Sequence, residues 1–325
     1  MSKLKTTYVI LISVIITTLF CALLYFFLDN PKTTTEEKSY RSTPIRYSFL
    51  STQVDSSQEN LVNFVGLRQD LNDYFKSENI DGSLYFEYLP TGSSIRINSN
   101  EDIEITDLLK VPIAMELYKS AELGLVSLNR PIDIKPSQLS GSGETWESYS
   151  SQGIIRITLE LAAQRMLQDN DESAKNIIVD SIANLLNPED SVFNDIDATY
   201  SGDEGKAQFM NSKSYSSILK CLYYSCSLSP ENSNKILSLL VEAPEAGGLK
   251  QSLEGESIMV ATKANSLLDG VQSDCGIFYL ENRDYLLCIF LRKPTVEEGV
   301  AQDDRTNYFR NISKQVFEFV NNSRR

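Results

Sequence analysis

Residues 107–112 read Asp-Leu-Leu-Lys-Val-Pro, and the fold is best approached from this stretch. It follows an extended run and opens an apolar helix, so Asp107 is expected at the helix N-terminus with Lys110 one turn later. Helix N-termini favour anions and oxyanions. A serine at position 107 could be deprotonated by Lys110 and attack a carbonyl, whereas an aspartate cannot. The stretch therefore poses a question about activity as well as fold.

The N-terminus predicts a membrane anchor. Residues 6–28 contain no charged side chain, and a helix of that length at about 1.5 Å per residue would cross a hydrocarbon core of roughly 30 Å. Because Lys3 and Lys5 precede the run and Asp29 follows it, the positive-inside rule places the N-terminus in the cytoplasm and the rest outside. A cleaved signal peptide is the alternative, but the run is long and lacks a small-residue exit.

Beyond the anchor, composition separates a linker from a folded domain. Residues 29–57 are rich in Thr and Ser and have too few regularly spaced apolar positions for a core, whereas residues 58–325 are expected to form one domain. The chain carries a net charge of −14. This acidity disfavours nucleic acid as a partner, although solubility alone would also explain it.

The chain contains no histidine, which excludes Ser-His-Asp and Cys-His catalysis and most zinc sites. We expect neither a metal nor a cofactor. Cys21 lies in the predicted anchor, and the other cysteines have no metal-like spacing. A separation of five residues is a poor helical pairing, so buried free thiols are predicted for Cys221, Cys226, Cys275 and Cys288.

Periodicity predicts an α/β domain of the α+β kind. Helices are expected at 59–77 and 303–321, and a large, mostly helical insert at about 107–245. Strands are expected at 83–88, 94–98, 257–263, 275–280 and 285–291. The economical arrangement is one five-stranded antiparallel sheet, with the terminal helices on one face and the helical subdomain on the other.

Three short segments in this order resemble the motifs of the penicillin-interacting serine hydrolases, closest to the class A β-lactamase group. The family signatures are Ser-x-x-Lys, Ser-Asp-Asn and Lys-Thr-Gly. The corresponding segments here are Asp-Leu-Leu-Lys at 107–110, Gln-Asp-Asn at 168–170 and Lys-Ala-Asn at 263–265. The resemblance covers about residues 60–322 and implies a β-lactamase/transpeptidase-like fold.

The resemblance also implies site roles, which the residues meet only in part. In the family, the first Ser forms the acyl-enzyme and its Lys takes part in proton transfer. The second motif's Ser shuttles protons and its Asn contacts substrate, while the third motif holds the substrate carboxylate and supplies an oxyanion-hole N–H. Lys110, Asn170 and Lys263 match in type, but Asp107, Gln168, Ala264 and Asn265 do not.

The mismatches indicate a site that no longer performs catalysis. Asp107 removes the nucleophile, Ala264 removes a hydroxyl donor, and Asn265 adds a side chain where ligand must approach the backbone. Glu204 is the only candidate for the family's deacylating base. Thr106 is one residue from the nucleophile position, but a one-residue slip rotates a helical side chain by about 100°.

Two interpretations of Asp107 stay open. It could bridge Lys110 and Lys263 and close the site internally, or it could be an ordinary helix N-cap. Ser217 and Lys220 also spell Ser-x-x-Lys, which we interpret as a chance match inside a helix.

The candidate ligand-binding residues are Lys110, Asn170, Lys263, Asn265 and Trp146. An aromatic side chain near the cleft could cover a ligand, although packing in the core is the more common role.

Three functions compete. The first is a membrane-anchored, catalytically inactive β-lactamase-like domain outside the cytoplasmic membrane of a bacterium, which binds a cell-wall (peptidoglycan) peptide or a protein. The second is an active β-lactamase or D,D-peptidase-type hydrolase with a displaced nucleophile. The third is a structural membrane-anchored head without a small-molecule site. A cleft filled by Asp107, Gln168 and Asn265 would favour the third, and an open one would oppose it.

Overall fold

The computed structural model describes residues 62–323, except for several internal segments, and all described residues belong to the compact unit 41–325. The segments outside the description are 136–138, 140–145, 147–149, 152–153, 188–189, 195, 197–207, 245–247, 254, 257, 266–270 and 293–304. Within the described part, no helix is both long and apolar enough to span a bilayer. The predicted anchor at 6–28 and the linker at 29–57 lie outside this part.

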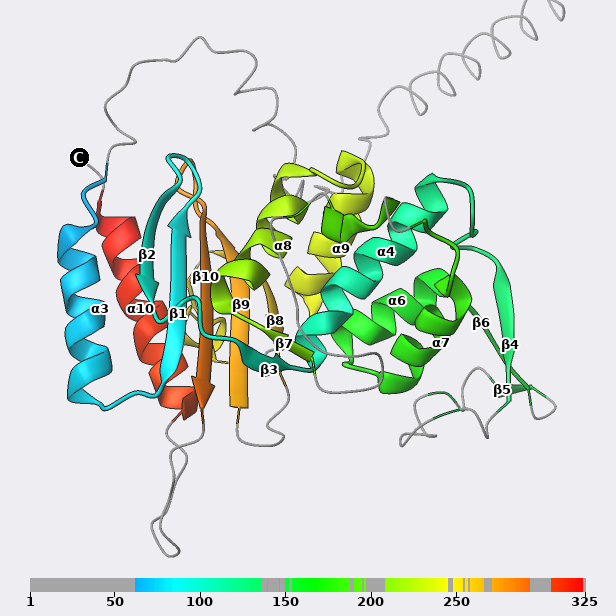
Figure 1. Ribbon diagram of the computed structural model, residues 1–325, viewed down its shortest axis with the longest axis horizontal. Coiled ribbons are helices and arrows are strands. Elements are labelled where there is room, and N and C mark those ends of the chain that lie inside the picture. The colour runs from blue at the N-terminus through cyan, green and yellow to red at the C-terminus, as the bar shows by residue number, and fades with distance from the viewer. Residues whose placement is uncertain are drawn as a thin grey trace, which may run out of the picture. The chain divides into compact units, whose positions relative to one another are not determined.

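A five-stranded antiparallel sheet forms the centre of the domain, in the order β2-β1-β10-β9-β8. The first and last parts of the chain meet where β1 pairs with β10, as Figure 1 shows. Each predicted strand is present, with ends shifted by a few residues. The strands span Gly82–Tyr88 (β1), Ser93–Ile97 (β2), Met259–Ala264 (β8), Val271–Tyr279 (β9) and Tyr285–Arg292 (β10).

Two apolar cores cover the two faces of this sheet. The terminal helices α3 (Val65–Ser77) and α10 (Arg305–Asn322) lie together on one face, and the helical subdomain lies on the other (Figure 1). Burial on both faces explains why β10 reads as an almost continuous apolar run, Tyr-Leu-Leu-Cys-Ile-Phe-Leu. The predicted arrangement of layers is confirmed.

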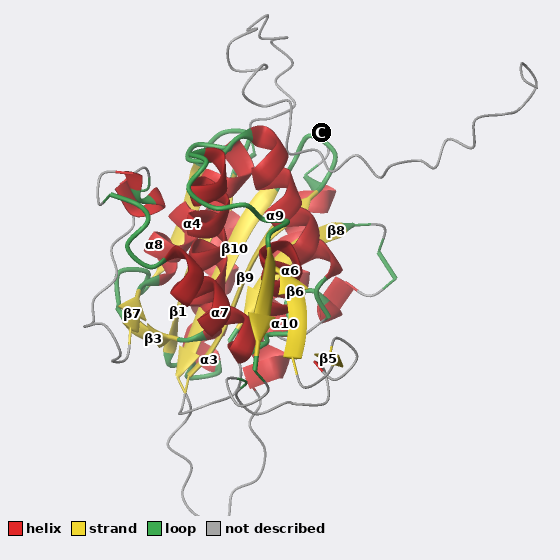
Figure 2. Ribbon diagram, turned by 90° about the vertical axis from the view of Figure 1, so that its right-hand side faces the viewer, coloured by secondary structure: helices red, strands yellow, loops and turns green. Residues whose placement is uncertain are grey.

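The helical subdomain contains five described α-helices of ten residues or more, seen in front of the sheet in Figure 2. They span Lys110–Glu122 (α4), Leu159–Gln168 (α6), Glu172–Ile182 (α7), Ser212–Tyr224 (α8) and Pro230–Glu242 (α9). The subdomain is less uniformly helical than predicted. It also holds β4 (Pro131–Ile134), β5 (Ser150–Ser151), β6 (Ile154–Thr158) and β7 (Gln208–Met210), of which β7 pairs with β3 (Ile103–Ile105).

The prediction of free thiols is wrong, because the four cysteines after Cys21 form two disulfides. Cys275 and Cys288 face each other directly across β9 and β10, with Cα atoms 4.1 Å apart. Cys221 and Cys226 pair because α8 ends between them, where Ser225 adopts a left-handed conformation (φ 53°) that turns the chain back. The helical-spacing argument assumed a helix that continued through residue 226.

Candidate functional site

The first motif lies where the chain leaves β3 and enters the helical subdomain. Asp107–Leu109 form a turn of 3₁₀-helix (η2) that continues into α4. The Nζ of Lys110 lies 2.6 Å from Oδ1 of Asp107, and both residues are buried, with 1% and 8% exposure. The N-cap interpretation is wrong, because Asp107 is the first residue of the turn and Thr106 holds the capping position. The carboxylate of Asp107 instead forms an ion pair with Lys110.

Lys110 has further partners on the segment that joins α6 to α7 and at the first residue of α7. Its ammonium donates to the backbone oxygen of Asn170 at 2.7 Å and to its Oδ1 at 3.2 Å, and Oε2 of Glu172 lies 3.5 Å away. Asn170 adopts a left-handed conformation (φ 60°), which asparagine tolerates well. Asp171 caps α7 by accepting from the N–H of Ala174, which fixes the start of that helix. The buried ammonium is thus fully provided with acceptors.

Lys263 reaches the site from β8, at the edge of the sheet. Its ammonium donates to the carbonyl oxygens of Met166 (3.4 Å) and Leu167 (2.9 Å), in the last turn of α6. Burial, with a smaller contribution from the charge of Lys110, lowers the pKa of Lys263 from 10.5 to about 7. The predicted bridge is therefore half right: Asp107 pairs directly with Lys110, whereas Lys263 bonds to a helix end and only senses the charge of Asp107.

Asn265, at the glycine position of the third motif, closes the same region from the sheet side. Its Oδ1 accepts from the N–H of Thr106 (3.1 Å), the hydroxyl of Thr106 (2.8 Å) and the N–H of Asp107 (2.9 Å). Asn265 itself is 6% exposed. The sequence predicted that this side chain would obstruct a ligand, and the structure shows which donor groups it covers.

Two candidates lie outside this cluster. Gln168 is directed toward α9, where its amide donates to Glu242 at 3.1 Å, so it does not fill the site. Trp146 is fully buried in the core of the helical subdomain, and the guanidinium of Arg165 lies 4.9 Å from its ring centre. The packing interpretation of Trp146 is the one that the structure supports, since a ring with no exposed surface cannot cover a ligand.

The alternative nucleophiles lack a base. Thr106 is exposed, but its hydroxyl donates to the amide oxygen of Asn265, which cannot accept a proton for catalysis. Ser217 donates to a carbonyl within α8, and Lys220 pairs with Glu87 of β1 at 3.2 Å. The chance-match interpretation of this second Ser-x-x-Lys therefore stands. Glu204 lies outside the described residues.

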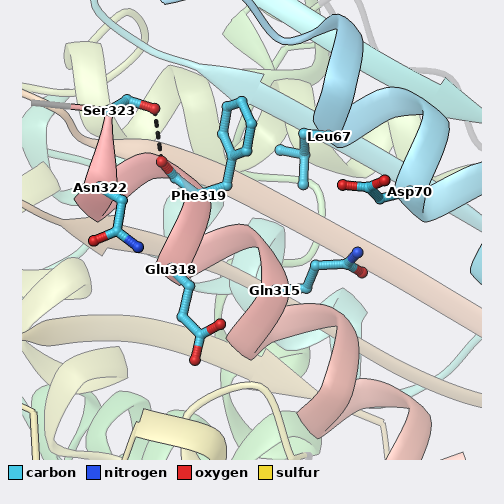
Figure 3. A pocket seen from close by; sticks show the side chains of 7 residues that line it. All are labelled: Leu67, Asp70, Gln315, Glu318, Phe319, Asn322 and Ser323. Atoms are coloured by element: carbon cyan, nitrogen blue, oxygen red, sulfur yellow. Dashed lines mark hydrogen bonds between the residues drawn. The ribbon is translucent and has the colours of Figure 1, made fainter. Parts of the chain in front are cut away.

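Away from the three motifs, the described residues form a surface groove but no cluster of metal ligands. Within them, no three His, Cys, Asp or Glu side chains come together to hold a metal ion. A shallow groove runs between α3 and α10 on the other side of the sheet, where Asp70, Glu318 and Phe319 are among its lining residues (Figure 3). It shares no residue with the three motifs.

Comparison with known proteins identifies the domain. The model of the Beta-lactamase enzyme family matches residues 66–320. The chain belongs to this family. Among solved structures, PBP-A is similar with a TM-score of 0.66 at 17% identity, covering 79% of this chain and 97% of that one. No curated protein matches the chain.

Two β-lactamase structures give the same result for the fold. A β-lactamase from Chitinophaga pinensis has a TM-score of 0.66 at 16% identity, covering 78% of this chain and 98% of that one. An ancestral class A β-lactamase has a TM-score of 0.65 at 17% identity, covering 78% and 99%. The penicillin-interacting serine hydrolase fold is therefore established for this family member, and the chemistry must be argued from its own residues.

The sequence did not predict three of the partners that hold the lysines. Glu172 approaches Lys110 from the first turn of α7, and the carbonyl groups of Met166 and Leu167 receive Lys263. The only signal for the first was the short distance in sequence between Asn170 and Glu172. Nothing in the sequence indicated the carbonyl groups of Met166 and Leu167 as partners, because every residue has a backbone carbonyl group whatever its side chain.

Proposed function

We propose that this β-lactamase-family chain is a catalytically inactive domain, anchored in the cytoplasmic membrane and exposed outside it, which acts by binding a cell-wall peptide or a protein partner. The observation that carries the proposal is the buried ion pair of Asp107 and Lys110. A carboxylate at position 107 does not replace a serine nucleophile, because its attack on an amide carbonyl would give an unstable anhydride instead of an ester. The ion pair also engages Lys110, the residue that would act as the base.

The burial of the other site residues indicates that the site is closed to ligands. Asp107, Lys110, Lys263 and Asn265 are each at most 8% exposed, so a ligand cannot reach the lysines without displacing side chains. Each of these residues is hydrogen-bonded within the protein. A partner is therefore expected to contact the outer surface of the domain, with the former catalytic residues serving as internal links between sheet and helices.

The proposed location rests on two observations. The uncharged run at 6–28, preceded by Lys3 and Lys5, has the features of an anchor with the domain outside. The two disulfides are typical of proteins that fold in an oxidising compartment. Both support an extracytoplasmic domain.

A structural head without any small-molecule site is the second candidate. It is favoured by the burial of Asp107 and Asn265, although Gln168 does not contribute to filling the site. Co-sedimentation of the full-length protein with purified peptidoglycan distinguishes the two, because a head with no ligand stays in the supernatant. Chemical cross-linking in membranes provides the corresponding test for a protein partner.

Intact-mass analysis after incubation with benzylpenicillin tests inactivity. The expected result is an unchanged mass under conditions that acylate an active family member used as a positive control. A covalent adduct would overturn the proposal. If one forms, its loss in the Thr106→Ala variant would locate the displaced nucleophile.

A further inference from the structure

Three donors converge on one point at the start of η2. They are the N–H and hydroxyl of Thr106 and the N–H of Asp107, all within 3.1 Å of a single oxygen. The backbone of Thr106 (φ −123°, ψ −83°) directs the two successive N–H groups to the same side of the chain. Donors that converge in this way, next to position 107, suit the oxygen of a carbonyl group that is attacked from that position.

Asn265 holds that point with a side chain that is itself firmly placed. Its own N–H donates to the carbonyl of Ser273 at 2.8 Å, which extends the pairing of β8 with β9 by one residue. The Oδ1 then accepts three hydrogen bonds, more than the two lone pairs of an amide oxygen ideally serve. Because Asn265 is buried, a ligand carbonyl and this amide cannot occupy the position together.

We infer that Asn265 is an autoinhibitory contact, a second block on the site that acts independently of Asp107. Its amide oxygen takes the place of a ligand carbonyl, so restoring a serine at position 107 does not by itself restore reaction. The inference deepens the proposed function and rests on it, since it takes the loss of the nucleophile as the first block. It assigns to Asn265 the exclusion of ligand rather than a role in folding alone.

The acyl transfer that the two blocks prevent can be written in full. In an Asp107→Ser variant, the serine oxygen would bond to the β-lactam carbonyl carbon as the ring C–N bond breaks. The neutral amine form of Lys110 would take the serine proton, and this proton would then pass to the ring nitrogen, so that no proton is gained or lost overall. The product retains the whole penicillin, so it is detected as an increase in intact mass.

The experiment compares the full-length Asp107→Ser and Asp107→Ser/Asn265→Gly proteins, each incubated with benzylpenicillin. We expect an adduct in the double variant to form at least about tenfold faster than in the single variant. A ligand carbonyl no longer has to displace the hydrogen bonds of Asn265, and the free energy of about one hydrogen bond corresponds to a factor of about ten. Asp107→Ser/Asn72→Ala is the matched control, because the amide of Asn72 donates to the backbone oxygen of Arg68 within α3, away from the three motifs. It should react like the single variant.

Equal rates in the single and double variants, or no adduct in either, would overturn the inference. Hydrogen exchange provides a readout that does not depend on acylation. In Asn265→Leu, which keeps the shape but removes the acceptor, the amides of Thr106 and Asp107 should exchange at least about tenfold faster than in the wild type. Unchanged exchange would show that the contact does not hold these amides in solution. An adduct on the wild-type chain would contradict the proposed function instead.

Discussion

Lys263 and Asp274 lie on neighbouring strands but on opposite faces of the sheet. Burial shifts the pKa values of these two ionisable groups in opposite directions. Lys263 pairs with Cys275 in the ladder and faces the helical subdomain, whereas Asp274 faces the terminal helices. Burial is the main cause of both pKa shifts, which bring the lysine down and the carboxyl up to about 7. Neither group has a direct counter-ion among the described side chains.

Asp107 and Lys110 differ from both, because they neutralise each other. Their ion pair is reinforced by the oxygens of Asn170, while among the described residues Oδ2 of Asp274 accepts from the backbone N–H of Leu249 and its Oδ1 has no hydrogen-bond partner. A buried charge is stable when its counter-charge and hydrogen bonds are complete, and it tends to be neutral otherwise. The region of Asp107 and Lys110 is therefore the more completely hydrogen-bonded of the two polar regions.

The largest expected effect comes from breaking the complete pair. Lys110→Met leaves the carboxylate of Asp107 buried without its partner, which should lower the free energy of unfolding by about 3–5 kcal/mol. The Asp107→Asn/Lys110→Met double variant removes both charges and should recover at least half of that loss. Urea denaturation of the three proteins measures this coupling.

The control for this pair is an exposed one. Arg156→Met removes the partner of Asp133 at the surface, and it should leave the denaturation midpoint unchanged. A double variant of Asp107 and Lys110 that is as unstable as the single variant would contradict the view that the two charges compensate each other.

A smaller effect is expected from Asp274, and it depends on pH. The folded pKa of about 7 lies above the ordinary value of 3.8, so the folded state holds the proton more tightly between about pH 4 and 7. Stability should therefore fall as the pH rises through this window, by up to about 4 kcal/mol, since each of the roughly three pKa units corresponds to about 1.4 kcal/mol. Asp274→Asn should flatten the profile of unfolding free energy against pH. An unchanged profile would contradict the shift.

The smallest effect concerns Lys263, and it has the opposite sign. Because the folded pKa is about 7 and the ordinary value 10.5, the unfolded state binds the additional proton between these values. Stability should rise with pH across this window, by about 2 kcal/mol, a value reduced because the carbonyls of Met166 and Leu167 solvate the charged form. Lys263→Met should remove the rise. A rise that persists in the variant would assign it to other groups.

Much of the fold could be predicted because apolar periodicity is local. The alternation of buried and exposed positions identified α3, α10 and the five strands, and the order of elements left one economical arrangement of layers. The small strands within the helical subdomain were missed. β7, for example, has only three residues and is defined by its pairing with β3, which a local pattern cannot reveal.

In the candidate site, too, local contacts could be predicted from the sequence and contacts between distant segments could not. The spacing of Asp107 and Lys110 on one helix predicted their ion pair, because residues three apart on a helical turn are neighbours. Gln168 belongs to the same motif as Asn170, which contacts Lys110. Its side chain nevertheless points to Glu242, because its orientation depends on where α6 ends against α9. The disulfides were missed for a related reason, since they depend on the turn at Ser225 and on the register of β9 with β10.

The sequence by itself determined that position 107 holds an aspartate instead of a serine, that the chain has no histidine, and that the elements follow the order of a β-lactamase-like fold. The tertiary structure alone decided that Lys263 bonds to the end of α6 and that Asn265 covers the N–H groups of Thr106 and Asp107. The physical reason is distance along the chain. These contacts join residues about a hundred or more positions apart, and only the packing of β8 against η2 and α6 brings them within hydrogen-bonding range.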